Sequence, residues 1–230
     1  MYRQTKDCPT STLRRSILGA GLFAISGIQA KAQGVRAAGI SQLTEAQRQM
    51  LTSLPVTPWL SLRESTISSV QQKLQQIIDA RPGIVPQWGD SQITGGALVT
   101  VSSVAGAGLL GEKGLRIFSL NFDLSQKLEL VIFMFERGFG GANIGITLDR
   151  VARRFSKYAS PIKIMDNTSE AADKYYIFDI GRFVIEVAIP QFGTFVTVNF
   201  SSKDTHKKMR IADSSYDLFM PVLERGISLR

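Results

Sequence analysis

The sequence predicts an α+β domain whose helices pack on antiparallel sheet, in two tandem units of one helix and three strands, αβββ-αβββ. Two segments carry apolar residues at helical spacing, each precedes three runs rich in Val, Ile and Phe, and the two helical segments align with each other. We expect a signal peptide at 1–32, a lead-in arm at 33–60 and one domain at 61–230, with halves at 61–140 and 141–230.

Residues 1–32 have the three parts of a secretory signal peptide. A basic stretch ends at Arg14-Arg15, an apolar run extends over residues 17–28, and Ala30-Lys31-Ala32 provides a small-x-small cleavage site. The run is shorter than the roughly 20 residues of a membrane span. We therefore expect a periplasmic or secreted protein. Residues 12–18 are similar to a twin-arginine signal, although Leu13 replaces the usual Ser or Thr; alternatively, the arginines belong to an ordinary basic region.

Charge and cysteine content exclude several classes of function. The single cysteine, Cys8, precedes the cleavage site, so the mature chain would have no thiol for a disulfide, a metal site or catalysis. Residues 1–32 hold five of the 27 Lys and Arg and one of the 19 Asp and Glu, so the net charge falls from +8 to +4 on cleavage. The remaining charge is scattered along the chain. We expect no nucleic-acid partner and at most a peripheral membrane contact.

The first half begins with a helix over residues 66–80. Its apolar stripe recurs at helical spacing, and Arg81-Pro82-Gly83 ends it. The stripe consists of Ile67, Val70, Leu74, Ile77 and Ile78. Three runs of strand composition follow, at residues 97–104, 115–122 and 127–136. This order predicts a helix lying across a three-stranded antiparallel unit.

The second half repeats this order. A helix is expected over residues 147–158, ended by Ser160-Pro161, and strands at 174–180, 182–189 and 194–200. Residues 66–74 align without gaps on residues 147–155, and each segment opens with Thr, a favourable N-cap. The alignment favours an internal duplication, although any two capped amphipathic helices share much of this pattern.

The last two long strands predict a tight hairpin around Ile180-Gly181. We expect Asp179 to lie opposite Arg182 as an ion pair, and Tyr176, Phe178, Phe183 and Ile185 to share one face. Asp179 and Glu186 then point outward on the other face, Glu186 beside Tyr175. This placement argues against a catalytic carboxylate pair.

Residues 145–155 resemble the Gly-Met-Thr-x-x-x-Val-x-x-x-Leu signature of small periplasmic α/β modules. These modules include the SmpA/OmlA outer-membrane assembly lipoproteins and the β-lactamase inhibitory protein. The resemblance covers mainly residues 144–200, with a weaker match at 66–136. Ile146 replaces the usual Met, Ser156 replaces the Gly that often follows the helix, and no lipid-attachment cysteine is present. The resemblance implies helical layers on antiparallel sheets and a surface that binds other proteins.

Two other motifs do not predict chemistry. Residues 106–111 have the glycine spacing of a dinucleotide-binding loop, but a strand rather than a helix follows, so a hairpin loop is expected. His206, the single histidine, lies in the basic run 203–208, which predicts a solvated loop. We therefore assign no catalytic, cofactor-binding or metal-binding residues, and expect no cofactor.

The remaining candidates are contact residues. Phe139 stands among glycines, and Lys203, Lys207 and Lys208 are available for an acidic partner. The sequence thus predicts a non-catalytic, exported binding or assembly module that contacts other envelope proteins, with its oligomeric state left open. The alternative is a carrier of a small lipid or sugar, or a hydrolase built from scattered Tyr and acidic residues. A pocket near Tyr158, Tyr175 or Tyr176 favours the alternative, and a flat apolar patch favours the binding module.

Overall fold

The computed structural model describes residues 52–80, 84–103, 110, 112–138, 143–156, 158–159, 161–165, 174–190 and 193–224. The expected signal peptide, most of the lead-in arm and Phe139 lie outside these residues. The described part has a mixed α and β fold with four helices, an eight-stranded antiparallel sheet and a two-stranded one. The α+β class predicted from the sequence is therefore confirmed.

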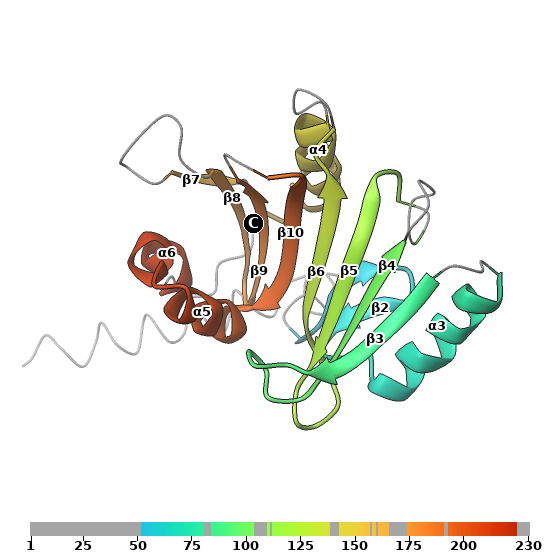
Figure 1. The fold of residues 1–230 in the computed structure, drawn as a ribbon. Coiled ribbons are helices and arrows are strands. Elements are labelled where there is room, and N and C mark those ends of the chain that lie inside the picture. The colour runs from blue at the N-terminus through green and yellow to red at the C-terminus, as the bar shows by residue number, and fades with distance from the viewer. Residues whose placement is uncertain are drawn as a thin grey trace, which may run out of the picture. The chain divides into compact units, whose positions relative to one another are not determined.

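The large sheet is built from two meanders that meet in its middle (Figure 1). The first comprises β3 (Ile84–Asp90), β4 (Ala97–Ser103), β5 (Leu115–Phe122) and β6 (Leu128–Glu136). The second comprises β7 (Ile162–Met165), β8 (Lys174–Ile180), β9 (Phe183–Ile189) and β10 (Phe195–Ser202). Because the strand order is β3-β4-β5-β6-β10-β9-β8-β7, the last strand of each half pairs with the last strand of the other.

Each half has four strands, so the expected count of three is wrong. The six predicted strands are present, each within two residues of its predicted ends, and the two that were missed, β3 and β7, are the edges of the sheet. β3 contains Pro86, which has no backbone N–H and normally argues against a strand. An edge strand tolerates it because one side of its backbone needs no ladder partner.

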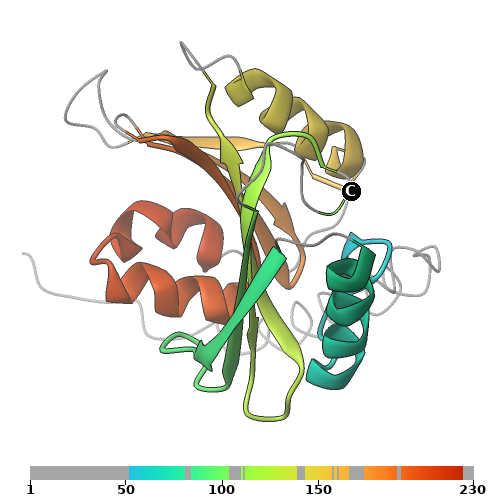
Figure 2. The same cartoon turned by 45° about the vertical axis from the view of Figure 1, so that its right-hand side comes forward.

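Helices cover the two faces of the sheet unequally (Figure 2). α3 (Ile67–Ala80) and α4 (Asn143–Phe155) lie on one side, and α5 (Lys203–Ala212) and α6 (Tyr216–Leu223) lie on the other. Thr66 caps α3 as predicted, because its Oγ1 accepts a hydrogen bond from the Ser69 N–H at 3.4 Å. Thr147 is not an N-cap, since α4 begins four residues earlier and Thr147 is buried inside it.

The main core lies between the sheet and the α3–α4 layer. Val70 and Leu74 of α3 and Val151 and Phe155 of α4 are buried there, at positions matched by the sequence alignment. The small hairpin of β1 (Leu54–Thr57) and β2 (Leu60–Leu62) packs into the same core. Its inward residues, Leu54, Leu60 and Leu62, are completely buried. Residues 54–60, assigned to the lead-in arm from the sequence, therefore belong to the domain.

The turn between β8 and β9 differs from its predicted register by two residues. Ile180 lies opposite Phe183, and Asp179 lies opposite Val184. Gly181 adopts a φ of 60° as the first residue of a two-residue turn, a conformation that glycine accepts without strain. Because side chains alternate with a period of two, a shift of two residues leaves every side chain on its predicted face. The faces are thus correct, while the predicted pairing of Asp179 with Arg182 is wrong.

Candidate functional site

The α5 side of the sheet is only half covered by the described helices. α5 lies against β9 and β10, and Phe219, Val222 and Leu223 of α6 pack on Ile177 and Val184. No described helix lies over β3, β4 or β5 on this side (Figures 1 and 2), and α5 reaches the start of β6, where Thr205 Oγ1 donates a hydrogen bond to a Glu129 carboxylate oxygen at 3.4 Å. We call nine outward-facing residues of β3 to β6 and the adjoining β10 the open face. It comprises Val85, Leu98, Thr100, Ser102, Ile117, Ser119, Ile132, Met134 and Thr197.

Strand register places these nine side chains on one surface. Ser102 lies opposite both Val85 and Ile117, and Met134 lies opposite both Ile117 and Thr197. The hydroxyl oxygens of Thr100 and Ser119 are 3.0 Å apart across two strands. Val85 is 60% exposed, and the others are partly buried. Five members are aliphatic or sulfur-containing and the rest are small alcohols, so the surface is weakly polar.

None of these nine side chains is charged, although charged residues make up 20% of the sequence. The Arg116–Glu136 ion pair borders them, because Glu136 follows Met134 by two positions on β6 and so points to the same side of the sheet. Gln87, on β3 opposite Thr100, is a polar neighbour. Exposed sheet surfaces usually alternate an inward apolar residue with an outward polar one. Here the outward positions of β5 and β6 include Ile117, Ile132 and Met134. Uncharged, partly apolar patches of this kind mark contact surfaces for other proteins.

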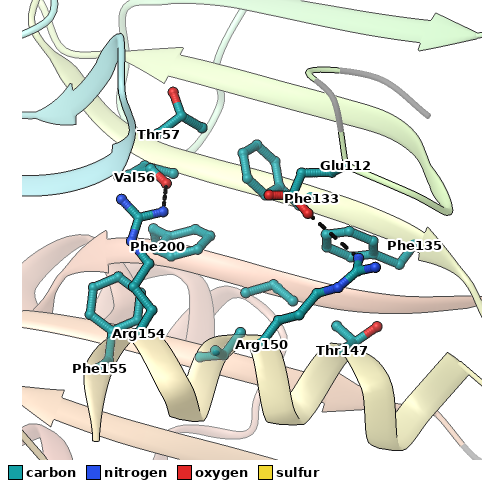
Figure 3. A pocket seen from close by; sticks show the side chains of 12 residues that line it. Val56, Thr57, Glu112, Phe133, Phe135, Thr147, Arg150, Arg154, Phe155 and Phe200 are labelled. Carbon is teal, nitrogen blue, oxygen red and sulfur yellow. Dashed lines mark hydrogen bonds and ion pairs between the residues drawn. The ribbon is translucent and has the colours of Figure 1, made fainter. Parts of the chain in front are cut away.

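A small pocket lies on the opposite side of the sheet, between α4 and the β1 strand (Figure 3). Its floor consists of the rings of Phe133, Phe135, Phe155 and Phe200, and Val151 and Val198 complete the apolar lining. The cavity volume is about 70 Å³. This is well below the roughly 300–1,000 Å³ of sites that enclose a drug-sized ligand or cofactor.

Two arginines of α4, one helical turn apart, extend across the mouth of this pocket (Figure 3). Arg154 donates hydrogen bonds to the carbonyl oxygens of Pro55, at 3.0 Å, and Val56. Arg150 donates to the Lys113 carbonyl at 3.0 Å, and its Nη1 lies 3.5 Å from a Glu112 carboxylate oxygen. Burial lowers the pKa of Arg154, and the charge of Glu112 opposes that shift.

A buried charged cluster fixes α5 to the sheet. The Glu186 carboxylate, on β9, accepts hydrogen bonds from His206 Nε2 at 2.7 Å, from Arg210, and from Asn199 Nδ2 at 3.0 Å. Glu186 and His206 are both 0% exposed. The Arg210 guanidinium also lies over the Phe219 ring, 4.2 Å from its centroid, and pairs with Asp213 at 2.7 Å. The cluster joins β9, β10, α5 and α6.

Opposing effects act on the protonation of Glu186. Burial raises its pKa, but the hydrogen bond from His206 and the charges of His206 and Arg210 outweigh burial, so its pKa is lowered from the ordinary value. The carboxylate therefore stays ionised inside the protein. Because α5 and α6 enclose it, the cluster is suited to holding the helices in place rather than to receiving a substrate.

This cluster corrects three expectations drawn from the sequence. His206 lies in helix α5 and not in a solvated loop, Glu186 is fully buried, and Asp179 is nearly buried and pairs with Lys203 at 2.8 Å. The sequence predicted a solvent-exposed outward face for β8 and β9, because α5 and α6, the helices that cover it, were not predicted. If α5 and α6 were left out, Glu186 and Asp179 would both be exposed to solvent on that face.

The three lysines predicted as contact residues all lie on α5. Lys203 pairs with Asp179, Lys207 pairs with Glu224 at 2.7 Å, and Lys208 is exposed on α5. Phe139 lies outside the described residues. The open face and the pocket were not predicted. The sequence of β5 and β6 did carry a signal for the open face. Side chains alternate between the two sides of a strand, and the outward positions Ile117, Ile132 and Met134 are apolar.

The described residues offer neither a cluster of metal ligands nor a membrane-spanning helix. They contain no group of three or more His, Cys, Asp or Glu side chains placed to hold a metal ion. No helix among them has both the length and the apolar character of a membrane span.

No protein-family model matches the chain, and no curated protein matches it. Among solved structures, the chain is similar to a DUF4309 family protein, YjgB, from Bacillus subtilis subsp. subtilis str. 168. That match has 12% sequence identity and a TM-score of 0.34, and covers 68% of this chain and 92% of the other.

Proposed function

We propose that this protein is an exported, non-catalytic binding module of the periplasm or the secreted fraction that contacts other envelope proteins through the open face. The observation that carries the proposal is a partly apolar patch, bordered by the Arg116–Glu136 ion pair, on the half of the sheet that the described helices leave largely uncovered. Removing such a surface from water stabilises a complex by about 25 cal/mol per Å² of apolar area. A partner with a flat apolar surface suits it.

The chemistry of the open face also separates partner classes. Nucleic acid and anionic lipid bind through clustered Lys and Arg, and none of the nine residues is basic. Protein interfaces are depleted of charge at their centre, as this surface is. A protein partner therefore fits the open face better than a polyanion.

We further propose that the two halves arose by duplication of one helix-and-strand unit. Aligned residues of α3 and α4, Val70 with Val151 and Leu74 with Phe155, are buried in the same core. The strand order is also symmetric about the β6–β10 pair. In such a duplicated sheet, both halves would present an equivalent outward face. α5 and α6 cover it only in the second half, which explains why an apolar surface remains open in the first.

Replacing Ile132 by Lys tests the contact role of the open face. The ammonium group would lie in the middle of the contact, so capture of envelope partners by cross-linking should fall at least about tenfold, equivalent to about 1.4 kcal/mol. Leu124→Lys is the matched control, because Leu124 is 84% exposed in the β5–β6 turn and off the open face. Circular dichroism checks that both variants fold.

Two outcomes of this experiment contradict the proposal. The first is equal recovery of the same partners by Ile132→Lys and Leu124→Lys. The second is a monomer that cross-links to no protein while lipid or sugar copurifies with it, which favours the carrier instead.

Deleting residues 2–32 tests export. We expect the intact chain in the periplasm or medium and the deleted chain in the cytoplasm, measured by cell fractionation, because the deletion removes the apolar run and the cleavage site. Replacing Arg14 and Arg15 by Lys assigns the route: loss of export indicates the twin-arginine pathway, and unchanged export indicates the general one. An intact chain that stays in the cytoplasm contradicts the proposal.

A further inference from the structure

The α4 pocket has an apolar interior. Four phenylalanine rings from α4, β6 and β10 form its floor, with Phe133 and Phe200 in edge contact at 5.5 Å between centroids. Such a floor favours an aromatic ring or a short aliphatic chain. A sugar is a poor fit, because its hydroxyl groups would lose hydrogen bonds to water against these rings.

The volume of the pocket limits the size of the ligand. A volume of about 70 Å³ is room for a few water molecules, at roughly 10–15 Å³ for each on the same measure. Only the end of a small molecule can therefore be enclosed, and the rest must lie in the mouth. A nucleotide or a complete lipid is too large to be enclosed.

The mouth of the pocket supplies charge complementarity for an anion. Arg150 and Arg154 bring two positive charges, against one negative charge from Glu112. Within the described residues, no ion pair with a carboxylate is formed by Arg154, which donates to the carbonyl oxygens of Pro55 and Val56 and lies over the Phe155 ring. Arg154 is exposed in part, yet desolvation of its guanidinium lowers its pKa, and an anion beside it would offset that cost.

Arg150 is the less firmly held of the two arginines, although Arg154 is the more exposed. Its contact with Glu112 is 3.5 Å, longer than the roughly 2.7–2.9 Å of a close charge-assisted hydrogen bond, and both side chains are partly exposed. A ligand carboxylate can therefore replace Glu112 with little loss. The Arg154 guanidinium, in contrast, is fixed by two β1 carbonyl oxygens.

We propose that this pocket binds a small monocarboxylate, with its apolar end on the phenylalanine floor and its carboxylate bound by Arg150 at the mouth. This site is separate from the open face, on the opposite side of the sheet, and does not depend on the proposed protein contact.

Titration of the purified protein with 3-phenylpropionate and hexanoate, followed by two-dimensional amide NMR, tests this site. We expect saturable shifts in α4, β6 and β10, with a dissociation constant on the order of 1 mM. The matched alcohols, 3-phenylpropanol and 1-hexanol, should bind at least about tenfold more weakly, because they cannot pair with a guanidinium. The tighter of the two acids identifies the preferred apolar end.

Three variants make the test specific. Arg150→Gln should weaken acid binding at least about tenfold. Arg153→Gln, on the same helix but exposed and away from the pocket, should leave it unchanged. Glu112→Gln should strengthen it, because it removes the competing carboxylate. Equal binding of acid and alcohol, equal effects of Arg150→Gln and Arg153→Gln, or no saturable shifts would overturn the proposal.

Discussion

Replacing Glu186 by Ala should lower the free energy of unfolding by about 3–5 kcal/mol, the usual cost of removing one partner from a buried ion pair. The reason is the set of groups that Glu186 satisfies. His206, Arg210 and Asn199 all donate hydrogen bonds to its carboxylate, and His206 is as completely buried as Glu186. Without the Glu186 carboxylate, these donors stay buried but lose the acceptor that it provides, which costs folding free energy. Urea unfolding monitored by circular dichroism measures the loss.

A matched control separates burial from charge. Glu224→Ala removes a carboxylate that pairs with Lys207 at the exposed end of α6, and should leave stability nearly unchanged. If Glu186→Ala were as mild as Glu224→Ala, the buried cluster would not be what fixes α5 to the sheet.

The pH dependence of stability follows from the same carboxylate. Because the pKa of Glu186 is lower in the folded protein than its ordinary value of 4.5, the unfolded chain binds the proton more readily. Its contribution is therefore fully present above the ordinary pKa and is lost as the pH falls through the lower, folded pKa. Glu186→Gln should remove this part of the acid sensitivity, so its melting temperature should fall less between pH 5 and lower values than that of the unmodified protein. An unchanged acid profile would contradict the assignment.

Phe133→Ala should destabilise the protein by about 3–5 kcal/mol, as expected for truncating a buried aromatic side chain. Phe133 lies on β6, at the junction of the two halves. Its ring is in edge contact with Phe118, Phe135 and Phe200, at centroid distances of 6.4, 6.2 and 5.5 Å. Truncation leaves a cavity that removes ring contacts to Phe118 of the first half and to Phe200 of the second. Thermal and urea unfolding measure the effect.

The unfolding curve of this variant is also informative. The sheet is continuous through the β6–β10 pair, so we expect one cooperative transition before and after the substitution. Leu124→Ala is the control, because an 84% exposed side chain contributes little to the core. Two separate transitions in Phe133→Ala, with one half remaining folded, would show that the halves are independent units.

Local patterns in the sequence were sufficient for much of the secondary structure. The helix at 66–80 and six strands follow from spacing within short segments, where side chains repeat every 3.6 or every two residues. The same period of two placed Phe178 and Ile185 on the buried face, although the turn shifted their register. These features depend on contiguous residues only.

Helix α5 shows where such patterns fail. Its buried side is formed by Thr205, His206 and Arg210, so a search for apolar periodicity finds none. His206 and Arg210 can be buried at low energetic cost because Glu186, on a strand distant in sequence, accepts hydrogen bonds from both. α6 was missed as well, since Pro221 lies inside it.

The candidate sites depend on contacts that are equally distant in sequence. The pocket forms where α4 meets β1, β6 and β10, and the open face exists because α5 and α6 cover β8 to β10 and leave β3 to β5 free of described helices. The order of residues along the chain specified the elements and the faces of the strands, because those follow from backbone geometry. Strand order, the burial of charge and the shape of each surface required folding, because their energies come from residues that only tertiary packing brings together.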